Sequence, residues 1–258
     1  MRKALFSSML GSLICILIWG HAWAIELPFI DDFDNGDYHS YVDETGNTVN
    51  YWVPVKQAYG TSSQLSISES NSTLILTTND YYGGGIKSAV TNDYNFFSHP
   101  ISIKVSDLIV GGTGGASDQR LLLRLTPYQN TPYLTRNALE ISVSGEGRFQ
   151  LTATDDSGVS IQLINYLFKL PFVATNFELS LNATQYELKL TWPGGGLFFN
   201  GDHGLSGVNW TDNQYPHLPG DSLIMILGSS IAKFTNTTTA SIGKIEVNAG
   251  SWQLEGCQ

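Results

Sequence analysis

Apolar and polar side chains alternate with a two-residue period along most of this chain after its first two dozen residues. In residues 101–106, for example, Ile101, Ile103 and Val105 alternate with two serines and a lysine. Successive side chains of an extended strand point to opposite faces, so this period is typical of strands with one face in a core. Ten or more short strands at this spacing, with almost no helical pattern, predict an all-β sandwich or barrel.

The alternation locates two hairpins. Residues 138–154 predict one, with its turn at Gly145-Glu146-Gly147, and residues 177–192 predict another. Glu178 and Glu187 lie on opposite arms of the second hairpin. Like charges directly opposite each other destabilise a strand pair, so we expect the register to set Glu178 across from Lys189 instead.

Two shorter patterns predict where strands sit within a sheet. Residues 50–57 form a strand near a sheet edge, because Pro54 cannot donate a backbone hydrogen bond. Residues 223–227 are apolar on both faces, as a central strand would be.

Two segments depart from the two-residue period. Residues 159–170 carry apolar side chains at helical spacing, so a short helix ended by Pro171 is compatible with this segment. Residues 193–220 begin with three consecutive glycines after a proline and contain several loop-forming residues, which predicts one long loop. Loops of this length inside a compact domain usually have a function or are disordered.

The first 24 residues have the features of a secretion signal. Arg2 and Lys3 precede an apolar run, and Ala22-Trp23-Ala24 is a small-x-small cleavage site. The alternative is a membrane anchor, but the run is shorter than the roughly 20 residues that span a bilayer. We therefore expect a signal peptide over residues 1–24, a single β-sandwich domain over residues 25–258, and a secreted or periplasmic protein without membrane insertion.

The balance of charges makes some partners unfavourable. The whole chain has a net charge of −10, and loss of Arg2 and Lys3 with the signal changes it to −12. A protein this acidic repels phosphate backbones as a whole, so nucleic acid is a poor partner. Only Cys257 remains in the mature chain, and it has no second cysteine with which to form an intrachain disulfide.

The order of these features resembles the concanavalin A-like lectin/glucanase superfamily. The resemblance rests on Phe29-Ile30-Asp31-Asp32-Phe33 near the start, on residues 240–247 near the end, and on the two hairpins between them. It implies two curved antiparallel sheets in a jelly roll, with the first and last strands side by side. It also implies a carbohydrate as the partner of the protein.

Glu140 is the best candidate for a catalytic carboxylate. Retaining glycosidases need two carboxyl groups about 5–5.5 Å apart. The glucanases that this chain resembles carry them in a Glu-x-Asp-x-Glu strand, and the nearest match here is Glu140-Ile141-Ser142-Val143-Ser144. Because Ser142 and Ser144 occupy the two other acidic positions, the match argues against catalysis. An ordinary solvent-facing role for Glu140 is the simpler interpretation.

Other catalytic patterns are also incomplete. Alginate lyases of the same superfamily carry an Arg-x-Glu-x-Arg strand, whereas this chain has Arg120 and Arg124 with Leu122 between them. His203 and His217 fall in the 193–220 segment, where solvated loop histidines are favoured over a metal or catalytic site. No Gly-x-Ser-x-Gly nucleophile motif occurs.

The acidic start of the domain suggests calcium, which takes several oxygen ligands. Asp31, Asp32, Asp34 and Asp37 lie close together in sequence, although their spacing does not fit a helix-loop-helix calcium site. We expect no required cofactor and keep a structural calcium as an alternative to a simple polar turn.

Aromatic residues in predicted loops are the strongest positive sign of a ligand. The apolar faces of sugar rings stack on flat aromatic rings, while sugar hydroxyls bond to carboxylates and amides. The candidate contacts for carbohydrate are Tyr81, Tyr82, Asp202, Trp210 and Tyr215. The alternative for Trp210 is that it folds back to cover a sheet edge.

The sequence therefore favours a secreted, non-catalytic carbohydrate-binding protein. A glycoside hydrolase or polysaccharide lyase with a site elsewhere, and a structural or adhesive surface protein, stay open as alternatives.

Overall fold

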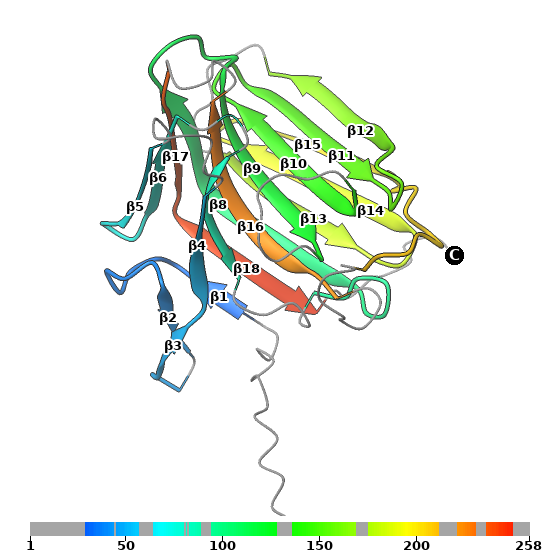
Figure 1. Cartoon of the computed structure of the whole chain (residues 1–258), viewed down its shortest axis with the longest axis horizontal. Helices are drawn as coiled ribbons and strands as arrows, with labels where there is room; N and C mark the ends of the chain where they lie inside the picture. Colours follow the sequence, from blue (N-terminus) through cyan, green and yellow to red (C-terminus); the bar gives the residue numbers. More distant parts are fainter. Residues whose placement is uncertain are drawn as a thin grey trace, which may run out of the picture.

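The computed structural model describes residues 29–43, 45–56, 64–79, 81, 83–88, 94–127, 136–168, 175–211, 221–230 and 236–249. Every regular element in these ranges is a strand (Figure 1). Within them, no helix is long and apolar enough to cross a membrane. The predicted signal peptide lies outside the described residues.

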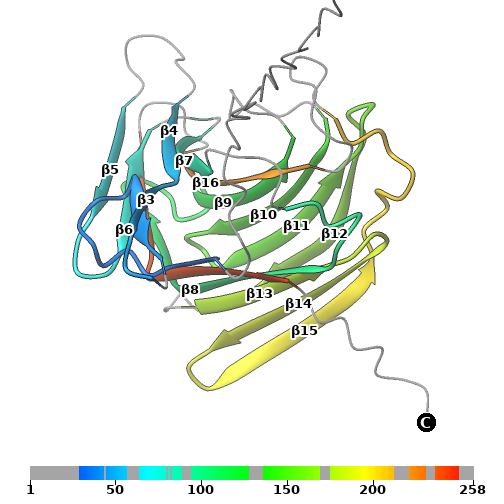
Figure 2. The same cartoon turned by 90° about the horizontal axis from the view of Figure 1, so that it is seen from below.

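Two large antiparallel sheets form the molecule, and they appear as separate layers when the view is turned by 90° (Figure 2). The first has nine strands, of which seven follow the order β15-β14-β13-β8-β17-β6-β5, while β18 pairs with both β1 and β8. Their bounds are β1 Phe29–Asp31, β5 Leu65–Glu69, β6 Leu74–Thr78, β8 Ile101–Gly112, β13 Thr175–Leu181, β14 Gln185–Trp192, β15 Gly195–Asp202, β17 Thr238–Ile242 and β18 Lys244–Ala249.

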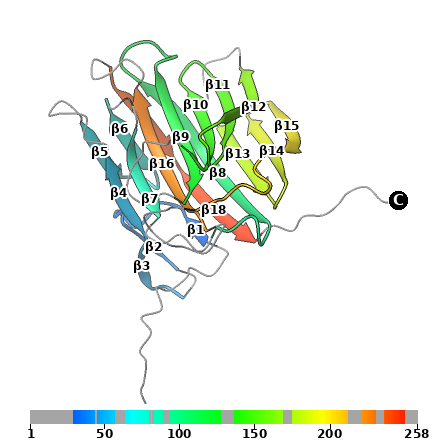
Figure 3. The same ribbon diagram turned by 45° about the vertical axis from the view of Figure 1, so that its right-hand side comes forward.

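The second sheet has seven strands in the order β12-β11-β10-β9-β16-β7-β4. It packs face to face with the first, as an oblique view shows (Figure 3). Its strands are β4 Trp52–Lys56, β7 Gly84–Ser88, β9 Gln119–Thr126, β10 Ala138–Ser144, β11 Arg148–Thr154, β12 Ser160–Leu167 and β16 Leu223–Ser230. A small ribbon of β2 (Ser40–Val42) and β3 (Thr48–Asn50) stands beside the two sheets.

The core fills the space between the two sheets. Alternate residues of each strand enter it, for example Leu121, Leu123 and Leu125 of β9, all of which are buried. Burying such side chains contributes roughly 1.5–3 kcal/mol each. Burial of the apolar residues that recur at every second position is therefore the main source of this fold's stability. The all-β, two-sheet antiparallel sandwich is thus confirmed.

The two predicted hairpins are present. β10 and β11 are joined by Gly145-Glu146-Gly147, and β13 and β14 pair in the register that sets Glu178 across from Lys189. Pro54 lies in β4, an edge strand, and β16 is central, with both neighbours paired to it.

The possible helix at residues 159–170 is wrong, because this segment contains strand β12. Leu151 pairs with Ile164 but the next residue, Thr152, pairs with Gln162. One extra residue on β12, a β-bulge, breaks the two-residue period. The apolar spacing therefore imitates a helix in a strand whose hydrogen bonds go to β11.

The single long loop at residues 193–220 is also wrong in its first part. Residues 195–202 form β15, which pairs with β14 along its whole length, and Trp192 lies opposite Gly195. The turn between them needs Gly194, whose φ of 91° is unfavourable for residues with side chains. The glycines of β15 hid an alternation in which Leu197 and Phe199 pack against the core.

The last two described strands both pair with β8, the longest of the described strands. β17 pairs with residues 109–112 of β8, and β18 pairs with residues 101–106. β18 is also paired with β1, where Phe29 lies opposite Val247. The first and last described strands are therefore side by side, as the resemblance implied.

Candidate functional site

Trp210 lies in the hydrophobic core, and only 2% of its surface is exposed. Its indole Nε1 donates a hydrogen bond to Ser222 Oγ at 2.9 Å, and its ring packs edge-on against Phe96 and Phe97. A ring enclosed in this way offers no face to a sugar. Trp210 therefore packs inside the protein, which was the alternative to a contact with sugar.

The other candidate contacts do not converge. Asp202 is exposed at the end of β15, an edge of the nine-stranded sheet, and accepts a hydrogen bond from Gly204 N at 2.7 Å. Tyr81 is 38% exposed, and its carbonyl oxygen accepts a hydrogen bond from Ser229 Oγ near the end of β16 in the other sheet. Tyr82 and Tyr215 lie outside the described residues.

His203 is not a solvated loop histidine, because it is fully buried. Its Nε2 lies 3.0 Å from the carbonyl oxygen of Asn182, and its Nδ1 accepts a hydrogen bond from Leu205 N at 3.1 Å. These partners fit the neutral ring with its proton on Nε2. Burial lowers the pKa of His203, so the ring stays neutral and ties the end of β15 to the β13–β14 bend. His217 lies outside the described residues.

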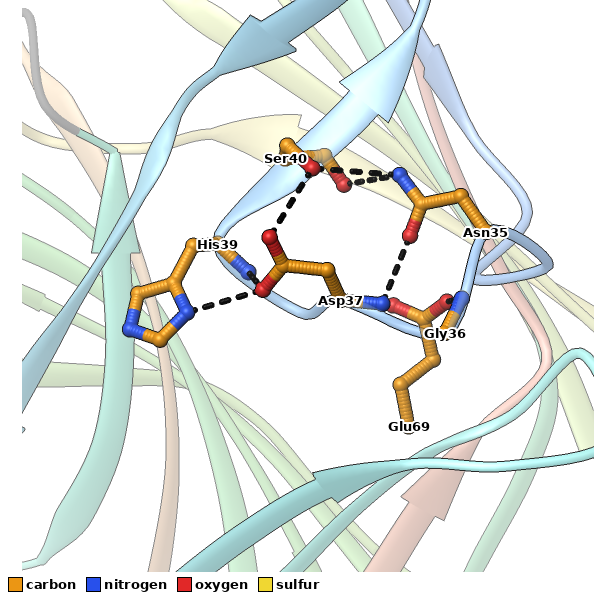
Figure 4. Close-up of polar contacts among 6 residues, drawn as sticks. All are labelled: Asn35, Gly36, Asp37, His39, Ser40 and Glu69. Carbon is orange, nitrogen blue, oxygen red and sulfur yellow. Dashed lines mark hydrogen bonds and ion pairs between the residues drawn. The ribbon is translucent and has the colours of Figure 1, made fainter.

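The polar turn after β1 is held by its own groups (Figure 4). Asp37 accepts hydrogen bonds from the backbone N and ring Nδ1 of His39, at 3.1 and 2.9 Å. Asn35 Oδ1 accepts one from Asp37 N at 2.8 Å, and Glu69 of β5 accepts one from Gly36 N. The hydrogen bonds from His39 lower the pKa of Asp37, so this carboxylate is charged and already bonded within the protein.

Asp31 belongs to the core rather than to this turn. Its Oδ1 accepts a hydrogen bond from Phe33 N at 2.9 Å, and its Oδ2 accepts one from Trp52 Nε1 at 2.6 Å. Burial raises the pKa of Asp31 to about 7, against the lowering effect of these hydrogen bonds.

Asp31 and Asp37 therefore direct their carboxylates to different partners and do not share one site. Across the described ranges, no group of three or more His, Cys, Asp or Glu side chains could hold a metal ion. A structural calcium stays a prediction, to be tested by thermal unfolding with added calcium and with a chelator.

Glu140 lies on the side of the seven-stranded sheet that is turned away from the nine-stranded sheet, which we call the outer face. Its neighbours on β10, Leu139 and Ile141, enter the core, so Glu140 points the opposite way. Strand register then fixes its surroundings: Arg124 of β9 on one side and Thr152 of β11 on the other. Glu140 forms an ion pair with Arg124.

Ser142 and Ser144 follow Glu140 on the same face of β10, two and four residues further along the strand. Ser142 lies between Leu122 of β9 and Gln150 of β11. None of these neighbouring positions holds a carboxyl group that could act with Glu140.

Apolar side chains form the centre of the outer face. They make a small cluster apart from the main core, and all of them are buried: Val55, Leu122, Leu223, Met225 and Leu227. One row of paired residues crosses this part of the sheet. In it, Lys87 of β7 lies next to Met225 of β16, and Met225 lies next to Arg124 of β9.

Basic side chains border this apolar cluster. Arg120 lies four residues before Arg124 on β9 and pairs in register with Ser229. Arg148 of β11 donates hydrogen bonds to Glu146 Oε1 at 3.0 Å and to Asn165 Oδ1 at 3.1 Å. Burial lowers the pKa of Lys87. The outer face thus combines an apolar centre with charged and amide groups around it.

Sequence reasoning identified Glu140, Arg120 and Arg124 only as fragments of incomplete catalytic patterns. The alternation of β9 and β10 already placed these three on one kind of face, but the pairing of Glu140 with Arg124 depends on strand register. Lys87 and Gln150 were missed, because nothing in their local sequence distinguishes them from ordinary strand residues.

Comparisons with solved structures identify the fold. The carbohydrate recognition domain of Emp47p superposes with a TM-score of 0.51 at 12% identity, over 83% of this chain and 97% of that chain. Rv0315, described as a pseudo beta-1,3-glucanase of Mycobacterium tuberculosis, has a TM-score of 0.50 at 12% identity, with coverage of 86% and 98%. A glycoside hydrolase family 16 endo-glucanase from Bacteroides ovatus has a TM-score of 0.50 at 11% identity, with coverage of 85% and 99%.

At these identities the similarity establishes the fold, which is that of the concanavalin A-like lectins and glucanases. Carbohydrate recognition domains and glycoside hydrolases share this fold. No protein-family model matches the chain, and no curated protein does.

Proposed function

We propose that this protein binds carbohydrate without cleaving it, on the outer face of the seven-stranded sheet. The fold supports a carbohydrate-related role, because both carbohydrate recognition domains and glucanases adopt it. The predicted signal peptide agrees with such a role, since a secreted or periplasmic protein meets extracellular glycans.

The proposal that no glycosidic bond is cleaved rests on the residues next to Glu140. Hydrolysis with retention needs a second carboxyl group about 5–5.5 Å from the first. Arg124, Thr152 and Ser142 occupy the outer-face positions next to Glu140 on β9, β11 and β10. A serine or threonine hydroxyl cannot protonate a leaving group near neutral pH, and the Glu140 carboxylate is already paired with Arg124.

The accessible polar groups of the outer face suit a sugar instead. Glu140, Gln150 and Thr152 are partly exposed, and Asn165 on β12 is exposed. Carboxylates accept and amides both donate and accept hydrogen bonds, which is what sugar hydroxyls require. These four groups come from three adjacent strands, so a rigid sheet holds them in place.

A matched pair of variants tests the proposal. Gln150→Ala removes an amide from the outer face, whereas Gln185→Ala removes the same group from β14 of the other sheet. Binding to a panel of immobilised polysaccharides should weaken about fivefold in Gln150→Ala, the effect of one lost hydrogen bond, and stay unchanged in Gln185→Ala.

Reducing-end release from the same polysaccharides should be absent for the wild-type protein. Hydrolysis that Glu140→Gln abolishes would refute the non-catalytic proposal, and failure to bind any polysaccharide would refute carbohydrate binding itself.

A further inference from the structure

Charges are divided unevenly between the two sheets. The strands of the nine-stranded sheet carry more acidic than basic residues: Asp31, Glu69, Asp107, Glu178, Glu187, Asp202 and Glu246 against Lys104, Lys189 and Lys244. The strands of the seven-stranded sheet show the opposite excess: Lys56, Lys87, Arg120, Arg124 and Arg148 against Glu140 alone. A chain with a net charge of −10 has therefore gathered basic residues on the sheet that carries the proposed site.

The protein neutralises some of these cations internally. Arg124 forms an ion pair with Glu140, and Arg148 forms one with Glu146. Among the residues that the structure describes, no acidic side chain lies within ion-pair distance of Arg120 or Lys87. These two positive charges are left for another partner.

Arg120 shows this most clearly. Its Nε is buried and has no hydrogen-bond partner, although leaving a buried polar group unpaired destabilises a protein. The side chain as a whole is only partly buried, so part of it is accessible to a ligand. An anion bound there would satisfy the unpaired group, and the planar guanidinium matches carboxylate or sulfate oxygens in a two-pronged contact.

Lys87 and Arg120 are too far apart for one small anion to be the natural ligand. They are separated by two strand spacings and four residues along the strand, which places their Cα atoms ~17 Å apart. The apolar cluster with Leu122, Met225 and Leu227 lies between them and is itself buried, so a ligand would contact the two cations at the margins of this cluster. A ligand that reaches both needs several acidic groups along an extended molecule.

We propose that the carbohydrate bound by this protein is an acidic polysaccharide, with carboxylate or sulfate groups held by Arg120 and Lys87. This inference rests on the proposed carbohydrate binding and specifies its ligand. The negative charge of the rest of the molecule does not prevent it, since solvent-exposed charges more than about 8 Å apart are largely screened at physiological ionic strength.

The experiment compares ligands that differ in charge but share a backbone. Binding is measured for polygalacturonate and its neutral methyl ester, and for a sulfated galactan and its unsulfated form. The acidic form of at least one pair should bind at least tenfold more tightly than its neutral form, an estimate from about 1.5–3 kcal/mol per charged hydrogen bond. The pair that shows the difference identifies the acidic group.

Variants link this preference to the two residues. Arg120→Gln and Lys87→Gln should each weaken binding of the acidic polymer about tenfold, whereas Lys189→Gln on β14 should change it less than about twofold. Neither outer-face variant should lower the thermal unfolding temperature, because neither residue has an ion-pair partner to lose.

Each contrary result has its own meaning. Equal binding of acidic and neutral forms would overturn the acidic ligand while leaving carbohydrate binding intact. Equally tight binding of single-stranded DNA would overturn it by showing a general affinity for polyanions. No binding to any polysaccharide would remove both proposals.

Discussion

Asp31 is an ionisable residue whose surroundings favour its neutral form. Burial raises its pKa to about 7, so near neutral pH the folded protein holds a proton that the unfolded chain, with an ordinary pKa near 3.8, has released. Stability from this group is therefore fully present below about pH 4 and falls as the pH rises toward 7, by up to about 1.4 kcal/mol per pH unit.

We predict that Asp31→Asn removes this dependence. We compare the difference in unfolding free energy, variant minus wild type, at two pH values. This difference should become more positive by about 2–4 kcal/mol when the pH is raised from about 4 to about 7.5, because only the wild type loses stability from Asp31. Urea unfolding at both pH values measures it.

His203 also changes the stability of the protein with pH, so its effect has to be separated from that of Asp31. Its lowered pKa acts in the opposite direction, with stability lost as the pH falls below about 6.5. His203 is present in both proteins, so its contribution cancels in the comparison. A constant difference between wild type and Asp31→Asn at the two pH values would contradict the raised pKa of Asp31.

Trp210 should matter for stability and not for binding. Trp210→Ala removes a buried ring and its hydrogen bond to Ser222, and should cost about 3–5 kcal/mol of unfolding free energy. Trp210→Phe, which keeps an aromatic ring, should cost less. The folded fraction of both variants should bind polysaccharide like wild type. Normal stability with lost binding would instead support a direct contact between Trp210 and a sugar.

At the scale of strands, the packing of β7 against β16 depends on Gly85. A Cβ at this position would overlap the carbonyl oxygen of Ile226, so any side chain forces the two backbones apart. We predict that Gly85→Ala costs about 1–3 kcal/mol, as overpacking usually does. Denaturant unfolding measures this cost.

Gly111, on β8 of the other sheet, is the control. It has open space where a Cβ would be, so Gly111→Ala should be nearly neutral. Similar losses from the two alanine variants would mean that the close approach of β7 and β16 is not the cause.

The strands that could be predicted from the sequence are those with an unbroken alternation of apolar and polar residues and a hydrogen-bonded partner that follows directly in the chain. The hairpins of residues 138–154 and 177–192 have an unbroken two-residue period and a short turn, and both were found. β12 was missed because its bulge shifts one apolar side chain out of phase. β15 was missed because its glycines and the preceding proline imitate a loop, whereas its partner β14 supplies the order that the local sequence lacks.

The candidate site was predictable only in part, for a related reason. Alternation along β10 separates Glu140, Ser142 and Ser144 from the core, and this needs no knowledge of other strands. The ion pair between Glu140 and Arg124 joins residues on different strands, and their pairing is a property of register. Trp210 was a poor prediction because a tryptophan in a polar segment looks the same whether it packs inward or stands exposed.

For the whole molecule, ligand binding should appear as added stability. A ligand that binds only the folded state stabilises it by about 2.7 kcal/mol at a hundred times its dissociation constant. For a domain of this size that raises the unfolding temperature by about 5–10 °C. We therefore expect saturating acidic polysaccharide to produce such an increase, measured by differential scanning calorimetry.

The matching neutral polymer should produce a smaller increase at the same concentration. The increase with acidic polymer should be smaller in Arg120→Gln than in Lys189→Gln. An acidic polymer that lowers the unfolding temperature of the wild-type protein would mean that it prefers the unfolded chain.

The position of β18 between β1 and β8 also determines when the protein can fold during synthesis. A strand that ends at Ala249 separates two strands that leave the ribosome much earlier, so the larger sheet cannot close until the chain has been made as far as this residue. Such long-range pairing is slow to form, and the unpaired edges of β1 and β8 stay open to aggregation in the meantime. We therefore expect nascent chains that stop before β18 to aggregate more readily than chains that include it.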